Sequence, residues 1–154
     1  MTKRREARER VIQALYAIEL SGDEPAHVIA TAIAPWLEED RTSLRFAEKL
    51  FLFTLDDVEV IDDLITRHAE NWDLSRIAVL DRLILRLAIT ELLRFEDIPP
   101  KVTINEAIEL AKSFSTDRSA SFVNGILDSV LRDLQKEGKL VKSGRGIIGM
   151  TLPS

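Results

Sequence analysis

Residues 76–95 form the segment that most constrains the fold of this chain. Apolar side chains recur there at spacings of three and four and cover most of the helix circumference: Leu80, Leu83, Ile84, Leu85, Leu87, Ala88, Ile89, Leu92 and Leu93. A helix that is apolar on most sides is stable only where other elements surround it. We therefore expect a central buried helix with further helices packed around it.

The rest of the chain repeats the helical period, and no stretch alternates apolar and polar residues long enough to predict a strand. Ser21-Gly22 ends the first helix, Pro35 ends the second, and Thr42 or Ser43 caps the third. Thr103 and Glu106 have the spacing of a capping box, and Ser115 or Thr116 caps the last helix. The expected helices cover about 3–20, 24–34, 43–55, 57–70, 76–95, 103–114 and 117–137. The predicted class is all-α, with about seven helices.

Gly138 separates the helical part from the end of the chain. We expect one helical domain over residues 1–137. Residues 138–154 contain three further glycines with Lys139, Lys142 and Arg145. This composition predicts a flexible basic tail.

The composition argues for binding rather than catalysis. The chain has no Cys, and its two histidines are His27 and His68, too far apart in sequence for the usual zinc spacing. Glycine-rich phosphate loops and nucleophile elbows are absent. No apolar run reaches the length of a membrane span, and no signal-peptide core follows the amino terminus. We expect a cytoplasmic protein with no catalytic residues, no metal and no cofactor.

Charge is distributed unevenly along the chain, whose net charge is -5. Residues 1–13 carry five basic and two acidic side chains, whereas residues 56–63 carry five acidic and none basic. An acidic body with one basic end favours a single docking orientation for a polyanion. On a helical wheel Arg4 and Arg8 point in the direction of Leu15. We expect the helix start to project from the body, either to hold phosphates or simply to aid solubility.

A second apolar patch lies on the first helix, outside its main stripe. Ile12 and Tyr16 are one turn apart, about 100° from the direction of Val11 and Leu15. A tyrosine with an apolar body and a polar tip suits an interface. A neighbouring helix that covers Tyr16 explains the pattern equally well.

Four runs, in this order, resemble the NusB transcription antitermination factors of bacteria. They are Gln13-Ala14-Leu15-Tyr16, residues 81–92 (DRLILRLAITEL), residues 102–114 (VTINEAIELAKSF) and Phe122-Val123-Asn124-Gly125. The resemblance extends from about residue 3 to 135, and the INEAIELAK and FVNG runs are its most specific parts. It implies an all-helical fold of two small bundles and no catalytic step.

The resemblance also implies partners. Family members pair with the ribosomal protein NusE, bind the boxA element of ribosomal-operon RNA, and join RNA polymerase and other Nus factors. BoxA is single-stranded, so its bases are open to stacking and to edge hydrogen bonds. With few aromatic residues the chain is expected to bind RNA weakly alone and more tightly with its partner.

The expected site residues, most of them carried over by the resemblance, fall into two sets. The expected RNA-binding set is Lys3, Arg4, Arg5, Arg8, Arg10, Arg118 and Phe122, although a core role for Phe122 is equally open. The expected partner-binding set is Ile12, from the wheel, with Tyr16, Asp81, Arg82 and Arg86. The chain departs from the family at Arg118, where members often have an acid, and at Ser121, where they often have a base. Arg118 would strengthen the attraction for phosphate.

Two other functions fit the same residues. NusB-like domains precede the methyltransferase module of some rRNA cytosine methyltransferases, and this chain could serve a separate catalytic chain in that way. Alternatively, two copies could pair through the face of Tyr16 and Asp81 to form a homo-oligomeric scaffold.

Overall fold

A computed structural model describes residues 3–69 and 73–149, and all the regular structure in these ranges is helical. The chain divides into two compact units, Met1–Asp57 and Val58–Ser154. This division agrees with the two bundles that the resemblance implies. No helix within the described residues is long and apolar enough to cross a membrane.

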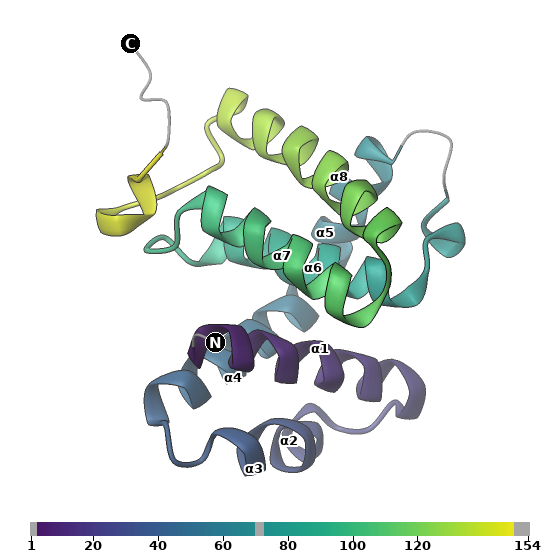
Figure 1. The fold of residues 1–154 in the computed structure, drawn as a ribbon, viewed down its shortest axis with the longest axis vertical. Coiled ribbons are helices and arrows are strands. Elements are labelled where there is room, and N and C mark those ends of the chain that lie inside the picture. The colour runs from purple at the N-terminus through teal and green to yellow at the C-terminus, as the bar shows by residue number, and fades with distance from the viewer. Residues whose placement is uncertain (1–2, 70–72, 150–154) are drawn as a thin grey trace. The chain divides into compact units, whose positions relative to one another are not determined.

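The first unit is built around α1 (Lys3–Ser21), which packs against α4 (Arg41–Asp56). The residues between these two helices in the sequence form one nearly continuous helical run (Figure 1). It consists of α2 (Pro25–Val28), a π-helical turn η1 (Ile29–Ile33) and α3 (Ala34–Leu37). We expected Pro35 to end this run. Instead Pro35 lies in the first turn of α3, where its missing N–H breaks no α-helical hydrogen bond.

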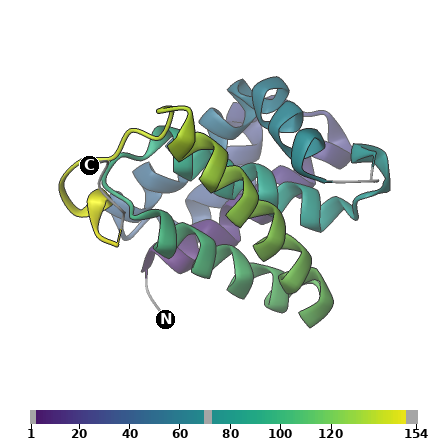
Figure 2. The same ribbon diagram turned by 90° about the horizontal axis from the view of Figure 1, so that it is seen from above.

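The second unit surrounds α6 (Val79–Arg94), the predicted central helix. It packs against α5 (Val58–His68), α7 (Pro100–Phe114) and α8 (Asp117–Lys136), and α7 and α8 lie side by side (Figures 1 and 2). Most of its residues from Leu83 to Leu92 are fully buried. The expectation for residues 76–95 is confirmed, except that Leu74–Arg76 forms a separate 3-10 turn, η2, and α6 begins later.

Capping was predicted with mixed success. The Thr116 side chain accepts from the Ser119 backbone N–H at 3.0 Å, as expected for α8. The capping box of Thr103 is wrong, because α7 already begins at Pro100. The buried Thr103 hydroxyl instead donates to the buried Glu91 carboxylate at 3.1 Å and links α7 to α6. For α4 the cap is Asp40, which accepts from Ser43.

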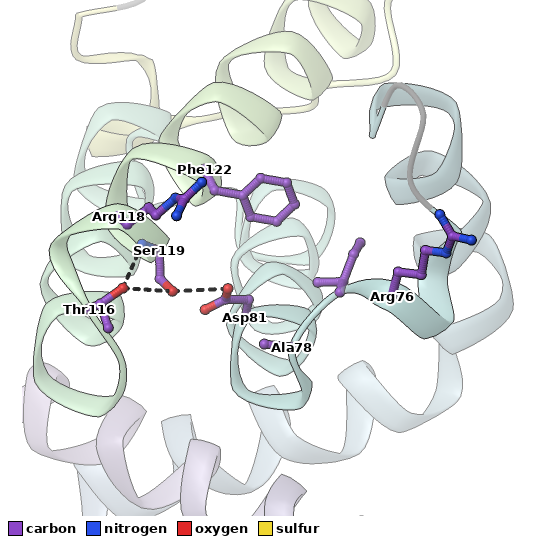
Figure 3. Close-up of a pocket in the computed structure, with 8 residues that line it drawn as sticks. Arg76, Ala78, Asp81, Thr116, Arg118, Ser119 and Phe122 are labelled. Carbon is purple, nitrogen blue, oxygen red and sulfur yellow. Dashed lines mark hydrogen bonds between the residues drawn. The ribbon is translucent and has the colours of Figure 1, made fainter.

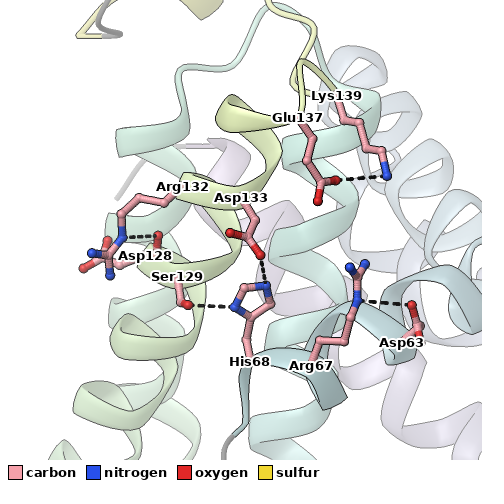
Figure 4. Close-up of polar contacts among 9 residues, drawn as sticks. All are labelled: Asp63, Arg67, His68, Asp128, Ser129, Arg132, Asp133, Glu137 and Lys139. Atoms are coloured by element: carbon pink, nitrogen blue, oxygen red, sulfur yellow. Dashed lines mark hydrogen bonds and ion pairs between the residues drawn. The ribbon is translucent and has the colours of Figure 1, made fainter.

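Two polar links join α5 to its neighbours. The Arg86 guanidinium donates two hydrogen bonds to the Asp62 carboxylate, at 2.7 and 2.8 Å. His68 lies between Ser129 and Asp133 of α8, with its ring nitrogens 2.7 Å from the Ser129 hydroxyl and 2.9 Å from the Asp133 carboxylate (Figure 4). These contacts fix the carboxyl end of α5 on α8.

Within the second unit, the carboxyl-terminal segment up to residue 149 packs against the end of α6 and the residues that follow it. The Ser143 N–H donates to the Glu96 carbonyl at 3.0 Å, and a β-carbon at Gly146 would collide with that carbonyl. The Lys142 amine donates to the carbonyls of Glu91 and Phe95, at 3.2 and 2.7 Å. It thereby satisfies backbone acceptors at the end of α6. The expectation of a loose tail is wrong for these residues, and 150–154 lie outside the described part.

Lys142 gives this segment a pH dependence. Burial is the main cause that lowers the Lys142 pKa to about 8 from 10.5, against the opposing pull of Glu91, Asp97 and Glu96. Between these two values the unfolded chain binds the additional proton, so the free energy of unfolding increases as the pH rises. Because solvent still reaches part of the amine, we expect a gain of only about 1 kcal/mol. Chemical denaturation of wild type and Lys142→Met across this range measures it, and equal pH profiles would contradict it.

Candidate nucleic-acid interface

The basic start of α1 is held against an aromatic ring of α4. The guanidinium carbons of Arg4 and Arg8 lie 4.7 and 5.3 Å from the centre of the Phe46 ring. Arg8 is only 2% exposed. The expectation that this helix start must project is therefore wrong for Arg8, because a planar guanidinium can stack on an aromatic face and be buried with it.

Two other basic residues of α1 also make contacts within the first unit. The Arg10 guanidinium lies 3.8 Å from the centre of the Trp36 ring, and its Nε donates to the Ala32 carbonyl at 3.1 Å. Burial lowers the Arg10 pKa. The Lys3 amine is 3.5 Å from the Asp40 carboxylate but stays 80% exposed.

The five predicted RNA-binding residues of α1 therefore differ in accessibility. Lys3 and Arg4 are exposed and Arg5 is half-buried, so a phosphate could reach these three side chains. Arg8 is buried, and its predicted contact with RNA is contradicted by that burial. Arg10 is half-buried, and its guanidinium is held against the Trp36 ring. This contact suits Arg10 to orient the start of α1 more than to contact RNA directly.

The two residues of the second apolar patch on α1 differ in exposure. Tyr16 is 40% exposed, which favours its interpretation as an interface residue over a covered one. Ile12 is completely buried. The prediction that Ile12 offers a partner an exposed surface is wrong, since the wheel cannot show how many neighbours surround a helix.

A pocket of about 360 Å³ lies in the second unit, where α6 and α8 begin. Figure 3 shows Arg118 and Phe122 coming from α8, with Arg76 on the opposite side. Arg118 is exposed and Phe122 is half-buried, so the Phe122 side chain is not confined to the core. The complete lining is Arg76, Ile77, Ala78, Asp81, Thr116, Arg118, Ser119 and Phe122.

Asp81 is the one acidic residue among those that line this pocket. It is 7% exposed, and one of its carboxylate oxygens, Oδ2, accepts from the Ser119 hydroxyl at 3.1 Å. Burial raises the Asp81 pKa, and hydrogen bonds from Ser119 and Ser115 oppose that rise. The resemblance implied that Asp81 faces the partner and that Phe122 contacts RNA, and Arg118 was expected to attract phosphate; all three line one pocket.

The other residues expected to bind the partner on α6 are less accessible. Arg86 is held by its two hydrogen bonds to Asp62, with a side chain only 13% exposed. A partner would have to compete with this ion pair, and the contribution of Arg86 to the partner surface stays a prediction. Arg82 is half-buried, and its role stays a prediction.

Four residues of these sites were not found from the sequence. Phe46 and Trp36 hold the arginines of α1, and Arg76 and Ser119 complete the pocket. The cap at Thr116 was the available signal for Ser119, since a capped helix start orients the residue three positions later. No local pattern indicates which aromatic ring a distant arginine will contact.

The chain matches the NusB family over residues 5–132. It belongs to the NusB family. It is 49% identical to the transcription antitermination protein NusB of Salinibacter ruber over 150 residues, which is 97% of this chain and 94% of that relative. These matches confirm the resemblance drawn from the INEAIELAK and FVNG runs.

Solved structures of the family share the fold. NusB of T. maritima is 40% identical, with a TM-score of 0.73 over 86% of this chain and 93% of that one. A structure of the antitermination factors NusB and NusE in complex with double-stranded RNA has a TM-score of 0.78 over 86% of this chain and 98% of that one. Its identity is 24%, so this second likeness shows the fold alone.

Proposed function

We propose that this chain is an RNA-binding transcription antitermination factor. With the ribosomal protein NusE it binds boxA RNA of ribosomal operons and joins the antitermination complex of RNA polymerase in the cytoplasm. The observation that carries the proposal is the 49% identity, over nearly the whole chain, to a protein named for transcription antitermination. That a fold neighbour is described as a NusB–NusE complex with RNA supports the choice of partners. The role is one of binding, with no catalytic step.

The side chains of both units suit an RNA ligand. Lys3, Arg4 and Arg5 give the first unit a cluster of accessible positive charge, and Arg76 and Arg118 do so at the pocket of the second. Arginine forks match phosphate oxygens, and Phe122 offers an aromatic face for a base. The cations of both units thus suit contacts to the RNA backbone, and Phe122 suits a contact to a base.

Fluorescence anisotropy with labelled single-stranded boxA RNA tests this function directly. We expect binding to weaken as salt rises, with a slope of about -3.5 in a plot of log affinity against log salt, because the five accessible cations of the two clusters neutralise about five phosphates of a single strand. Adding NusE should tighten binding, since the pair presents a larger RNA surface.

A duplex of the same sequence is the matched competitor in this assay. Its bases are paired, so we expect it to bind less tightly than the single strand at every salt concentration. No binding of the single strand at low salt, with or without NusE, would refute the proposed function. Equal binding of duplex and single strand would refute the assignment of a single-stranded ligand.

A further inference from the structure

A cavity of about 300 Å³ lies in the first unit, beside the start of α1. Trp36 of α3 lines this cavity and is 58% exposed, although tryptophan is highly buried on average. Neither the core of the unit nor the proposed contacts with RNA use this exposed aromatic surface. The cavity therefore has a feature that the proposed function does not explain.

The Trp36 ring is held from one side. The Arg10 guanidinium lies 3.8 Å from the ring centre, and the Arg10 Nε donates to the Ala32 carbonyl at 3.1 Å. The contact is thereby anchored to the backbone of the turn that precedes α3. Because Arg10 covers one face of the ring, the exposed area of Trp36 comes largely from the opposite face and the ring edge. Trp36 thus offers a ligand one fixed and open aromatic face.

The charged groups that line the cavity are mainly acidic. They are the carboxylates of Glu6, Glu39 and Asp40 and the amine of Lys3. Asp40 and Lys3 compensate each other, with 3.5 Å between carboxylate and amine. Glu6 and Glu39 are exposed, and neither forms an ion pair within the part of the chain that the structure describes. These two uncompensated carboxylates repel a phosphate and attract a cation.

We propose that this cavity docks an arginine side chain from a basic peptide segment of a protein partner. The guanidinium lies over the open face of Trp36, opposite Arg10, and Glu6 and Glu39 balance its charge. Tryptophan attracts cations more strongly than other aromatic residues do, and a planar guanidinium stacks on its ring. Tryptophan and arginine are also enriched among the residues that contribute most to the affinity of protein interfaces. The inference does not depend on the RNA ligand and adds a protein contact to the chain.

The cavity is separate from the surface of α1 that is expected to bind NusE. Glu6 and Tyr16 are on the same helix, and the ten residues between their positions correspond to about 15 Å along its axis. Tyr16 does not line the cavity. A segment that docks at Trp36 thus makes a contact distinct from the one expected at Tyr16.

Tryptophan fluorescence tests the inference. The chain has two tryptophans, so Trp72→Phe leaves Trp36 as the only reporter. The probe is the capped peptide Gly-Arg-Gly-Arg-Gly, and its control is the same peptide with citrulline, which keeps the shape of arginine without its charge. We expect the arginine peptide to change the Trp36 emission in a saturable way and to bind at least about tenfold more tightly than the citrulline peptide. Equal binding of the two peptides, or none, would overturn the inference.

Glu6→Gln/Glu39→Gln separates the cavity from the general acidity of the chain. We expect this variant to bind the arginine peptide about tenfold more weakly. Asp23→Asn/Glu24→Gln is the matched control, because it removes two exposed acids of the same unit that lie outside the cavity, and its affinity should stay near that of wild type. A similar decrease in both variants would contradict the inference, since the cavity would then have no special role.

The same variant distinguishes a peptide site from an RNA site. Removing Glu6 and Glu39 takes negative charge from beside the basic segment, so affinity for boxA RNA should stay the same or rise while affinity for the arginine peptide falls. Weaker binding of RNA would make the cavity part of the RNA site, and weaker binding of NusE would make it part of the NusE surface. Either result overturns the inference.

A measurement on wild type does not depend on how the variants fold. The arginine peptide should shift the indole N–H resonance of Trp36 in the NMR spectrum, and the citrulline peptide should not. A shift on raising the protein concentration without peptide would assign the cavity to a second copy of the chain and overturn the inference. Failure of the chain to bind boxA RNA would remove the proposed function and leave this inference intact.

Discussion

Replacing Arg8 with alanine is expected to lower the free energy of unfolding by about 2–4 kcal/mol, although arginine is usually a surface residue. Arg8 is 2% exposed, and its guanidinium stacks on the Phe46 ring. The substitution removes a buried side chain from between α1 and α4 and leaves a cavity. Chemical denaturation followed by circular dichroism measures the loss.

Arg45→Ala is the matched control for Arg8. Arg45 is an exposed arginine on α4, next to Phe46 in sequence, and its loss should change the free energy of unfolding by less than about 0.5 kcal/mol. Arg8→Met keeps most of the buried volume and should fall between the two. If Arg8→Ala were as stable as Arg45→Ala, the guanidinium could not be packed as the structure has it.

Much of the fold follows from helical periodicity. The nearly continuous apolar surface of residues 76–95 predicts the buried α6, and that helix is the centre of the second unit. The errors occur where tertiary contacts replace local ones. Thr103 has the spacing of a cap, but its hydroxyl bonds to Glu91 of another helix. Lys142 looks like a residue of a charged tail, but its amine reaches the end of α6.

The sequence predicted the chemical type of the binding residues better than it predicted which of them a ligand can reach. Charge alone indicated the basic segment of α1. The resemblance added Phe122, and the charge of Arg118, at a position where the chain departs from the family, added that residue; the structure places both in one pocket. Burial decides which of these side chains a ligand can reach, and burial depends on neighbours that are distant in sequence. Arg8 and Ile12 were misjudged for this reason, since a helical wheel treats the helix as if it were isolated.

The double substitution Arg4→Gln/Arg5→Gln is expected to have the largest effect on RNA binding. Both arginines are accessible, whereas Arg8 must be left intact so that loss of binding is not confused with unfolding. Removing two phosphate contacts from a single strand should reduce the salt slope by about 1.4. At moderate salt we expect affinity for boxA RNA to fall by at least about tenfold, measured by anisotropy.

The matched control removes the same charge from another surface. Arg132 and Lys136 are exposed residues at the carboxyl end of α8, and Arg132→Gln/Lys136→Gln should leave both affinity and salt slope near those of wild type. The preference among bases should persist in Arg4→Gln/Arg5→Gln, because phosphate contacts carry no sequence information. An equal loss in the two double variants would mean that net charge alone drives binding. A loss confined to Arg4→Gln/Arg5→Gln, with base preference intact, is the result that makes the start of α1 the part of the site that holds the RNA backbone.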